Sequence, residues 1–218
     1  MVRTKICGMT NEQDALKAAN LGAWAVGFIF YKKSPRFISP FKAKKIIEAL
    51  PPFVTPVGVF VNQGQGAIRD IVNHTGIRVV QLHGDEDPHF CQRVRKFNVK
   101  VIKVIRIGDN FDPKSLEAYK VDAFLFDTFD KDAYGGTGKA FNWRLLVEVK
   151  ALNLNTPIIL SGGLNNQNVI EPVNALKPYA VDVCSSVEQE AGKKEAKKVK
   201  EFIDIVSYIT GPNVKEHL

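Results

Sequence analysis

A cysteine and an aspartate are the two residues of this sequence best suited to proton transfer. Cys7 ends an apolar run that begins at Val2, and Asp127 follows the apolar run Ala123–Phe126. A thiol and a carboxyl group on opposite sides of one small molecule can act as base and acid. From their types alone, Cys7 could equally be a buried apolar cysteine, and Asp127 a helix cap or a salt-bridge partner.

Two short segments have the composition of a phosphate site. Ser161-Gly162-Gly163-Leu164 and Cys184-Ser185-Ser186 each follow a strongly apolar run. Glycines let backbone N–H groups approach an anion closely, a helix N-terminus adds partial positive charge, and serines add hydroxyl donors. Either segment alone could be a tight turn. Together they predict a phosphate site formed by Ser161, Gly162, Gly163, Ser185 and Ser186.

Further polar residues follow other apolar runs. Arg36 comes after the run Ala25–Phe30, and a guanidinium suits bidentate binding of a carboxylate, although a surface arginine is the commoner case. His83 ends the run at Gln81-Leu82-His83, where a lone histidine is more often structural than catalytic. A glycine-rich cationic loop with Gly135, Gly136 and Lys139 is predicted to be a lid that closes over an anion.

The sequence carries no motif for a metal or a cofactor. Its four histidines are dispersed, and neither an HExxH pair nor an Asp-rich calcium loop is present. The loop Tyr134–Lys139 resembles the dinucleotide fingerprint only loosely and lacks its early strand–loop–helix context. We therefore predict that the protein uses no metal and no cofactor.

The elements that must position these residues alternate regularly. Eight short apolar runs are separated by longer stretches with helical periodicity, and their continuous apolar character is typical of strands covered on both faces. The runs are Val2–Cys7, Ala25–Phe30, Thr55–Val61, Val79–Leu82, Val101–Ile105, Ala123–Phe126, Pro157–Leu160 and Val181–Cys184. The fold class is therefore α/β, and eight such units predict a single (β/α)₈ TIM barrel, whose active site forms after the carboxyl ends of the strands.

Capping residues and prolines mark the intervening helices. The predicted helices are Glu12–Asn20, Phe41–Leu50, His89–Lys96, Lys114–Tyr119, Trp143–Lys150, Gln167–Leu176 and Lys193–Tyr208. Pro172 is expected to shorten the helix that contains it. No linker divides the chain, so we predict one domain over residues 1–210 and a frayed polar tail over 211–218.

Composition limits the class of protein. A chain of 218 residues that is 45% hydrophobic can bury a large core without staples, and its three cysteines are too scattered for a disulfide framework or a zinc site. Free thiols fit a reducing compartment. The first residues lack an apolar segment of signal-peptide length, and no apolar stretch is long enough to span a membrane. These features predict a cytoplasmic protein with no membrane partner.

The net charge of +7 favours anionic partners. The densest basic stretch contains Lys193, Lys194, Lys197, Lys198 and Lys200, together with Glu195 and Glu201. We interpret it as a solvated helix face, because no aromatic residues interleave with the lysines as in a single-strand binding surface. A small phosphorylated metabolite is thus favoured over nucleic acid.

Several of these segments match a known family. They are Lys5-Ile6-Cys7-Gly8-Met9-Thr10, Gly27-Phe28-Ile29-Phe30, Ser34-Pro35-Arg36-Phe37-Ile38-Ser39, Val57-Gly58-Val59-Phe60-Val61-Asn62, Gln81-Leu82-His83-Gly84, Phe126-Asp127, Gly135-Gly136-Thr137-Gly138-Lys139, Leu160-Ser161-Gly162-Gly163-Leu164 and Ala180-Val181-Asp182-Val183. In this order, from residue 2 to about residue 190, they closely resemble phosphoribosylanthranilate isomerase.

The resemblance implies a TIM barrel that catalyses one step of tryptophan biosynthesis. Such enzymes convert N-(5-phosphoribosyl)anthranilate to 1-(2-carboxyphenylamino)-1-deoxyribulose 5-phosphate by an Amadori rearrangement. It also implies that Cys7 is the general base, Asp127 the general acid and Arg36 the ligand of the anthranilate carboxylate. The loops after strands seven and eight would hold the phosphate, and we expect His83 to contact the substrate.

One residue departs from the family's pattern. The family usually has Asp-Val-Ser-Ser-Gly-Val-Glu after strand eight, and this chain has Asp182-Val183-Cys184-Ser185-Ser186-Val187-Glu188. If the usual glycine needs a positive φ, Ser186 would strain or tilt the loop, and phosphate affinity would fall. Alternatively, the Ser186 hydroxyl could supply a new donor.

Two other functions remain open from the sequence. The first is a related barrel that acts on a phosphoribosyl aminoimidazole in histidine synthesis, although the family resemblance would then place an aspartate where Cys7 stands. The second is a catalytically inactive barrel that binds a phosphorylated ligand or a partner protein. The sequence is silent on whether the chain is a monomer or a homodimer.

Overall fold

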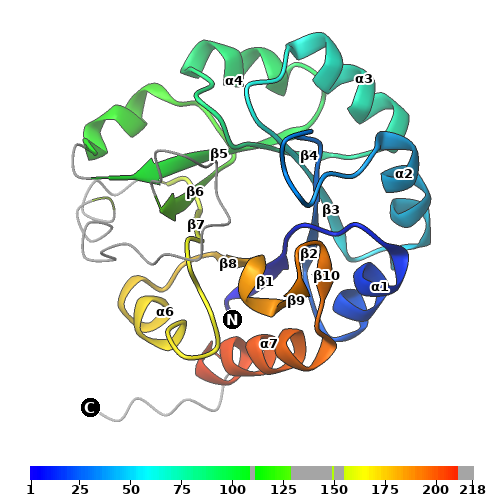
Figure 1. The fold of residues 1–218 in the computed structure, drawn as a ribbon. Coiled ribbons are helices and arrows are strands. Elements are labelled where there is room, and N and C mark those ends of the chain that lie inside the picture. The colour runs from blue at the N-terminus through cyan, green and yellow to red at the C-terminus, as the bar shows by residue number, and fades with distance from the viewer. Residues whose placement is uncertain (109–110, 129–148, 150–154, 211–218) are drawn as a thin grey trace.

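The computed structural model describes residues 1–108, 111–128, 149 and 155–210, and these form a closed barrel of eight parallel strands. Each strand pairs with the next along the chain, and β1 pairs with β8 to close the circle (Figure 1). The strands are β1 Arg3–Ile6, β2 Ala25–Ile29, β3 Thr55–Phe60, β4 Val79–Leu82, β5 Lys100–Ile107, β6 Ala123–Thr128, β7 Ile158–Leu160 and β8 Ala180–Val183. The predicted (β/α)₈ barrel is therefore confirmed.

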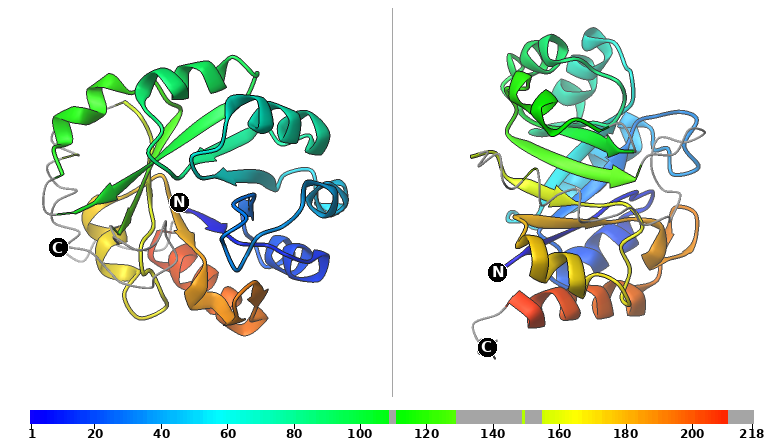
Figure 2. Two further views of the ribbon diagram at one scale, coloured as in Figure 1. Left: turned by 45° about the horizontal axis from the view of Figure 1, so that its top comes forward. Right: turned by 90° about the vertical axis from the view of Figure 1, so that its left-hand side faces the viewer.

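Helices cover the outside of the barrel in both views of Figure 2. They are α1 Glu12–Asn20, α2 Pro40–Ala49, α3 Gln65–Thr75, α4 Pro88–Arg95, the 3₁₀ helix η1 Pro113–Ala118, α6 Ile170–Leu176 and α7 Ala196–Thr210. The side chains of Asn11, Ser39 and Asp87 accept hydrogen bonds from the first turns of α1, α2 and α4, as N-cap residues do. These caps explain why those helices begin within one residue of the predicted positions.

Three helical segments differ from the prediction. No helix was predicted between β3 and β4, but α3 occupies this connection. It begins directly after its N-cap residue Gly64, which has no side chain to mark the cap. Helix α6 starts at Ile170 because the side chain of Asn165 accepts hydrogen bonds from the backbone of Gln167 and Asn168, which holds the preceding residues in a turn. The segment Pro113–Ala118 is a 3₁₀ helix.

The lysine-rich stretch is also not one continuous helix face. Lys193–Lys194 forms β10, which pairs with β9, Glu188–Glu190, in a small hairpin, and α7 begins only at Ala196. The interpretation of Lys194 as a solvated residue was wrong, because its side chain is buried with Glu188. A second 3₁₀ turn, η2 Ser185–Val187, connects β8 to this hairpin.

Three predicted segments lie outside the described residues. They are the lid loop with Gly135, Gly136 and Lys139, the helix Trp143–Lys150 apart from Val149, and the tail 211–218.

The core has two layers, because strand side chains alternate between the barrel interior and the surrounding helices. The outer layer packs strands against helices and includes Phe28, Phe60, Phe124 and Phe126, all fully buried. The inner layer contains Val57, Ile102, Val104, Ala123, Leu125, Ile159 and Ala180. The inner side chains show which positions of each strand point into the barrel, and the same alternation applies to the residues at the strand ends.

In the described part of the chain, no helix has both the length and the apolar character needed to cross a membrane.

Candidate active site

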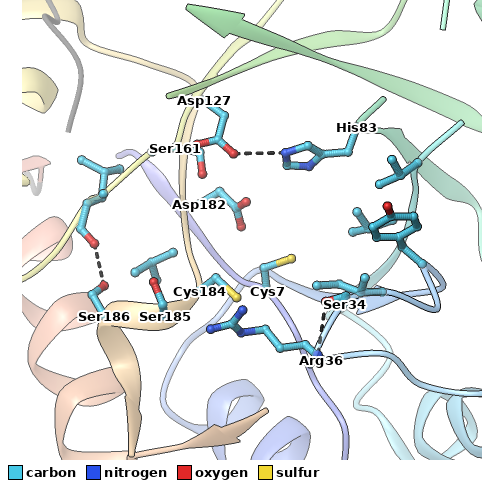
Figure 3. A pocket seen from close by; sticks show the side chains of 18 of the residues that line it. Cys7, Ser34, Arg36, His83, Asp127, Ser161, Asp182, Cys184, Ser185 and Ser186 are labelled. Atoms are coloured by element: carbon cyan, nitrogen blue, oxygen red, sulfur yellow. Dashed lines mark hydrogen bonds and ion pairs between the residues drawn. The ribbon is translucent and has the colours of Figure 1, made fainter. Parts of the chain in front are cut away.

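A pocket of about 240 Å³ opens at the carboxyl ends of the strands. Its polar lining includes Cys7, Ser34, Arg36, His83, Asp127, Ser161, Asn165, Asp182, Cys184, Ser185 and Ser186. Figure 3 shows Asp127 and His83 on one side, and Cys7, Cys184 and Arg36 on the other. The pocket thus brings together Cys7, Arg36, His83, Asp127, Ser161, Ser185 and Ser186, which were singled out from the sequence.

Strand periodicity explains why the key side chains point inward. Asp127 stands two residues after Leu125, and Ser161 stands two residues after Ile159; both reference residues belong to the inner layer. Positions two residues apart on a strand share a face. Asp127 and Ser161 are therefore the next inward positions of β6 and of the segment after β7, where the barrel interior meets the pocket.

Asp127 is held by a chain of hydrogen bonds from β4. His83 Nε2 lies 3.1 Å from Asp127 Oδ2, and Gln81 Nε2 lies 3.0 Å from His83 Nδ1. The imidazole therefore joins the amide of Gln81 to the carboxyl group of Asp127 through its two ring nitrogens. Asp127 is 5% exposed, so this contact fixes it at the wall of the pocket.

Cys7 sits above a buried ion pair. Lys5 Nζ lies 2.9 Å from Asp182 Oδ1, and both side chains are almost fully buried in the barrel interior. A hydrogen bond from Cys184 lowers the pKa of the Cys7 thiol well below its usual value, and the positive charge of Lys5 lowers it further, against the opposing effect of burial. Cys7 is therefore the thiol of this site that ionises more readily.

The ion pair itself is shifted by its surroundings. Burial raises the pKa of Asp182 to about 7, although the charge of Lys5 opposes this effect. Burial disfavours the ammonium of Lys5, but the negative charges of Asp182 and Cys7 outweigh it and raise the pKa of Lys5. Lys5 thus remains a fixed positive charge beneath the thiol at neutral pH.

Arg36 is oriented by a carboxylate. Its Nε and Nη2 atoms donate to both oxygens of Glu188, at distances between 2.8 and 3.1 Å. Glu188 also accepts a hydrogen bond from Lys194 Nζ at 2.7 Å. The hydrogen bonds between Arg36 and Glu188 raise the pKa of Arg36, so its guanidinium stays charged. Two cations share one anion here, and the surplus positive charge lies where Arg36 lines the pocket.

The predicted phosphate residues lie together on one wall. Ser161, Gly162 and Gly163 follow β7, while Ser185 and Ser186 follow β8, and all five line the pocket. Gly162 and Gly163 have φ angles of 80° and 68°, a left-handed conformation that glycine adopts without a steric penalty. This conformation explains why two glycines follow Ser161 and bring main chain to the pocket surface.

Ser186 does not strain the loop. It is absent from the positive-φ residues of the described chain and lies in the 3₁₀ turn η2. Its hydroxyl donates to the carbonyl of Leu164 at 2.5 Å, so it joins the loop after β7 to the loop after β8. The predicted backbone strain is therefore not found, and the hydroxyl stabilises the site by bridging its two loops.

Sequence reasoning missed several residues that hold the site together. Lys5, Gln81 and Glu188 were given no role, yet they contact Cys7, His83 and Arg36. Asp182 and Lys194 were also given none, and they form ion pairs with Lys5 and Glu188. A signal was present for two of them: Lys5 and Asp182 are charged residues inside predicted barrel strands. Such residues are rarely buried unless they are paired.

Comparisons with known proteins agree with this geometry. The family model described as N-(5'phosphoribosyl)anthranilate (PRA) isomerase matches residues 4–205. An N-(5'-phosphoribosyl)anthranilate isomerase of Geobacter sulfurreducens is 46% identical over 203 residues, which cover 93% of this chain and 97% of the relative.

Solved structures extend the comparison to three dimensions. The crystal structure of phosphoribosyl anthranilate isomerase from Thermus thermophilus is 36% identical, has a TM-score of 0.87, and is matched over 95% of this chain and 100% of its own. A phosphoribosyl anthranilate isomerase in complex with reduced 1-(o-carboxyphenylamino)-1-deoxyribulose 5-phosphate is 38% identical with a TM-score of 0.79, matched over 94% of this chain and 97% of its own.

Proposed function

The chain belongs to the N-(5'-phosphoribosyl)anthranilate isomerase family, and from this premise we propose how its own residues divide the reaction. The activity is the isomerisation of N-(5-phosphoribosyl)anthranilate in tryptophan biosynthesis, an Amadori rearrangement by general acid–base catalysis. Membership in this family argues against the first alternative, a barrel that acts on a phosphoribosyl aminoimidazole in histidine synthesis. The observation that carries the residue assignment is the placement of Cys7 and Asp127 on opposite sides of one pocket with Arg36 at its rim.

Asp127 is the general acid of this proposal. In its protonated form it donates to the ribose ring oxygen, so that the bond from this oxygen to C1 breaks and a protonated imine forms with the anthranilate nitrogen. His83, which was predicted to contact the substrate, lines the pocket and in this proposal also holds the carboxyl group of Asp127 at the wall. General acid–base groups of this kind contribute roughly 10²- to 10⁴-fold to a rate.

Cys7 is the general base. The protonated imine acidifies the proton on C2, and the Cys7 thiolate removes it to give an enolamine that tautomerises to the ketone. The lowered pKa of Cys7 supports this role, because more of the thiol is ionised near neutral pH. The nitrogen of the substrate accepts the electron pair, so the chemistry requires neither a metal nor a cofactor.

The two anionic groups of the substrate have separate sites in this proposal. Arg36 binds the anthranilate carboxylate, with Glu188 holding the guanidinium in place. The phosphate lies against Ser161, Gly162, Gly163, Ser185 and Ser186. The relative bound to a reduced 5-phosphate analogue of the product supports a phosphorylated small molecule as the ligand.

Location and assembly remain part of the proposal. We infer that the protein works in the cytoplasm, because its three cysteines are all free thiols. It acts as a monomer or a homodimer, with no nucleic acid and no membrane as partner. Analytical ultracentrifugation distinguishes the two assembly states.

The test is to follow anthranilate fluorescence after adding freshly made N-(5-phosphoribosyl)anthranilate to the purified protein in EDTA. We expect rapid loss of fluorescence without release of free anthranilate. Stable substrate in the presence of folded protein would overturn the proposal and favour the inactive, ligand-binding alternative.

A further inference from the structure

Two of the three cysteines are adjacent across the seam that closes the barrel. Strands β1 and β8 are paired with Lys5 opposite Asp182 and Ile6 opposite Val183. The backbone N–H of Cys7 then donates to the carbonyl of Val183 at 2.9 Å, which carries the pairing one residue further. Cys7 and Cys184 are therefore the next two residues along these neighbouring strands.

Their side chains share a face. Lys5 and Asp182 contact each other inside the barrel at 2.9 Å, and each cysteine stands two residues beyond one of them. Because strand side chains alternate, both thiols also point inward, and both line the pocket (Figure 3). The two thiols also shift each other's pKa as hydrogen-bonding neighbours do, lowering that of Cys7 and raising that of Cys184.

The spacing suits a covalent bond between them. Neighbouring strands lie roughly 4.8 Å apart. Disulfides join residues whose Cα atoms are about 4.4–6.8 Å apart. The Cys7–Cys184 pair therefore needs only side-chain rotation to bring the two sulfurs into bonding distance, with the barrel backbone in place.

The surroundings favour Cys7 as the thiol that reacts with an oxidant first and Cys184 as the thiol that then forms the disulfide with it. The hydrogen bond from Cys184 and the charge of Lys5 lower the pKa of Cys7, so Cys7 supplies the nucleophilic thiolate. Cys184 keeps its proton until Cys7 has reacted, because the hydrogen bond to Cys7 and burial raise its pKa well above the usual value. The positive charge of Lys194, whose Nζ lies 3.8 Å from Cys184 Sγ, opposes this effect. Small oxidants can reach both sulfurs through the pocket that they line.

We propose that Cys7 and Cys184 form a reversible disulfide on exposure to hydroperoxides, and that this bond switches the enzyme off. The Cys7 thiolate attacks the hydroperoxide, the O–O bond breaks, and a sulfenic acid and an alcohol or water are formed. The Cys184 sulfur then attacks the sulfenic sulfur, releases water and closes the disulfide. Two thiols are oxidised, one hydroperoxide is reduced, and an external dithiol restores both thiols.

The inactivation rests on the proposed role of Cys7, whereas the cross-link does not. The disulfide would consume the base and tie the Ser185–Val187 turn to β1, so substrate turnover would stop. Cys91 offers an internal control, because it is fully buried on α4 and burial raises its pKa to about 11, which makes it a poor nucleophile.

The experiment treats the wild-type protein with one equivalent of hydrogen peroxide in the presence of dimedone, which traps sulfenic acids. The Cys91→Ala variant serves as a control for the third thiol. Cys184→Ser is the matched variant, because serine stands at this place in the usual family pattern. Peptide mass spectrometry then locates cross-links and dimedone adducts, and activity is measured before and after dithiothreitol.

In wild type and Cys91→Ala we expect a Cys7–Cys184 cross-link, loss of activity in proportion to it, and full recovery with dithiothreitol. In Cys184→Ser we expect a dimedone adduct on Cys7 and inactivation that dithiothreitol does not reverse. A dimedone adduct on Cys7 of the wild type, without a cross-link, would overturn the proposal even if the variant failed to fold. A cross-link without loss of turnover would overturn the switch and would also contradict Cys7 as the base.

Discussion

His83 Nε2 lies 3.1 Å from Asp127 Oδ2, and the same imidazole receives a hydrogen bond from Gln81 on its other nitrogen. The contact connects β4 to β6 across the wall of the pocket. A histidine that is isolated in the sequence thus lies at the wall of the pocket, in contact with the proposed acid.

Replacing the acid and its partner should separate their roles. We expect Asp127→Asn to lower kcat by roughly 10²- to 10⁴-fold, because an amide cannot supply the proton. His83→Ala should lower kcat by about tenfold, equivalent to about 1.4 kcal/mol, because Asp127 remains but is less well oriented. KM should change less than kcat, because the residues that bind the two anionic groups stay in place. His89→Ala on the exposed face of α4 is the control. A His83→Ala variant with a raised KM and the wild-type kcat would rule out this positioning role.

Substitutions at the proposed site for the anthranilate carboxylate should change KM more than kcat. Arg36→Ala removes the guanidinium that binds the substrate, and we expect KM to rise by more than about tenfold with a smaller change in kcat. Glu188→Gln should raise KM less, because Arg36 stays but loses a charged partner. Steady-state kinetics of both variants, with exposed Arg69→Ala as the control, test this order. A larger effect of Glu188→Gln on kcat than on KM would contradict it.

The hydroxyl of Ser186 should contribute to phosphate binding. Because Ser186 Oγ donates to Leu164 O, both Ser186→Ala and Ser186→Gly should loosen the two phosphate loops and weaken binding of inorganic phosphate by a few-fold, about 1 kcal/mol. Competitive inhibition by phosphate measures this effect. Tighter binding in Ser186→Gly than in wild type would mean instead that the serine hinders the loop.

Much of the fold was predictable because its signals are local. Apolar runs indicated all eight strands. The prediction Glu12–Asn20 matches α1 at both ends, because Asn11 caps its start and Gly22, with a φ of 102°, follows its end. Helix α3 was missed because Gly64 leaves no cap signal. The inward direction of Cys7, Asp127 and Ser161 also followed from strand position, so their convergence could be predicted.

The supporting contacts could not be predicted in the same way. Arg36 and Glu188 are 152 residues apart, and Lys5 and Asp182 are 177 residues apart, so only the closed barrel brings each pair together. Lys194 stands in a lysine-rich stretch, and its burial depends on the hairpin that follows β8. Local composition contains no information about such long-range partners.

The buried Asp182 should make stability depend on pH. Its pKa is raised from 3.8 to about 7, chiefly by burial, so the folded state binds this proton more tightly than the unfolded chain. The stability that this carboxyl group contributes is therefore complete at low pH and is lost as the pH rises from 3.8 to about 7.

Urea unfolding of wild type and Asp182→Asn measures this contribution, because the asparagine does not titrate. The free energy of unfolding of the variant minus that of wild type should be more positive at about pH 8 than at about pH 5, because only the wild type loses stability over this range. A difference between the two proteins that stays constant with pH would contradict the shifted pKa.

The most direct test of the account is the kcat of Cys7→Ala, measured by the loss of anthranilate fluorescence. A buried cysteine tolerates alanine sterically, so the variant should fold, as circular dichroism can verify. We expect kcat to fall by roughly 10²- to 10⁴-fold, because no other group is assigned to remove the C2 proton. A variant that keeps the wild-type kcat would show that Cys7 is not the base.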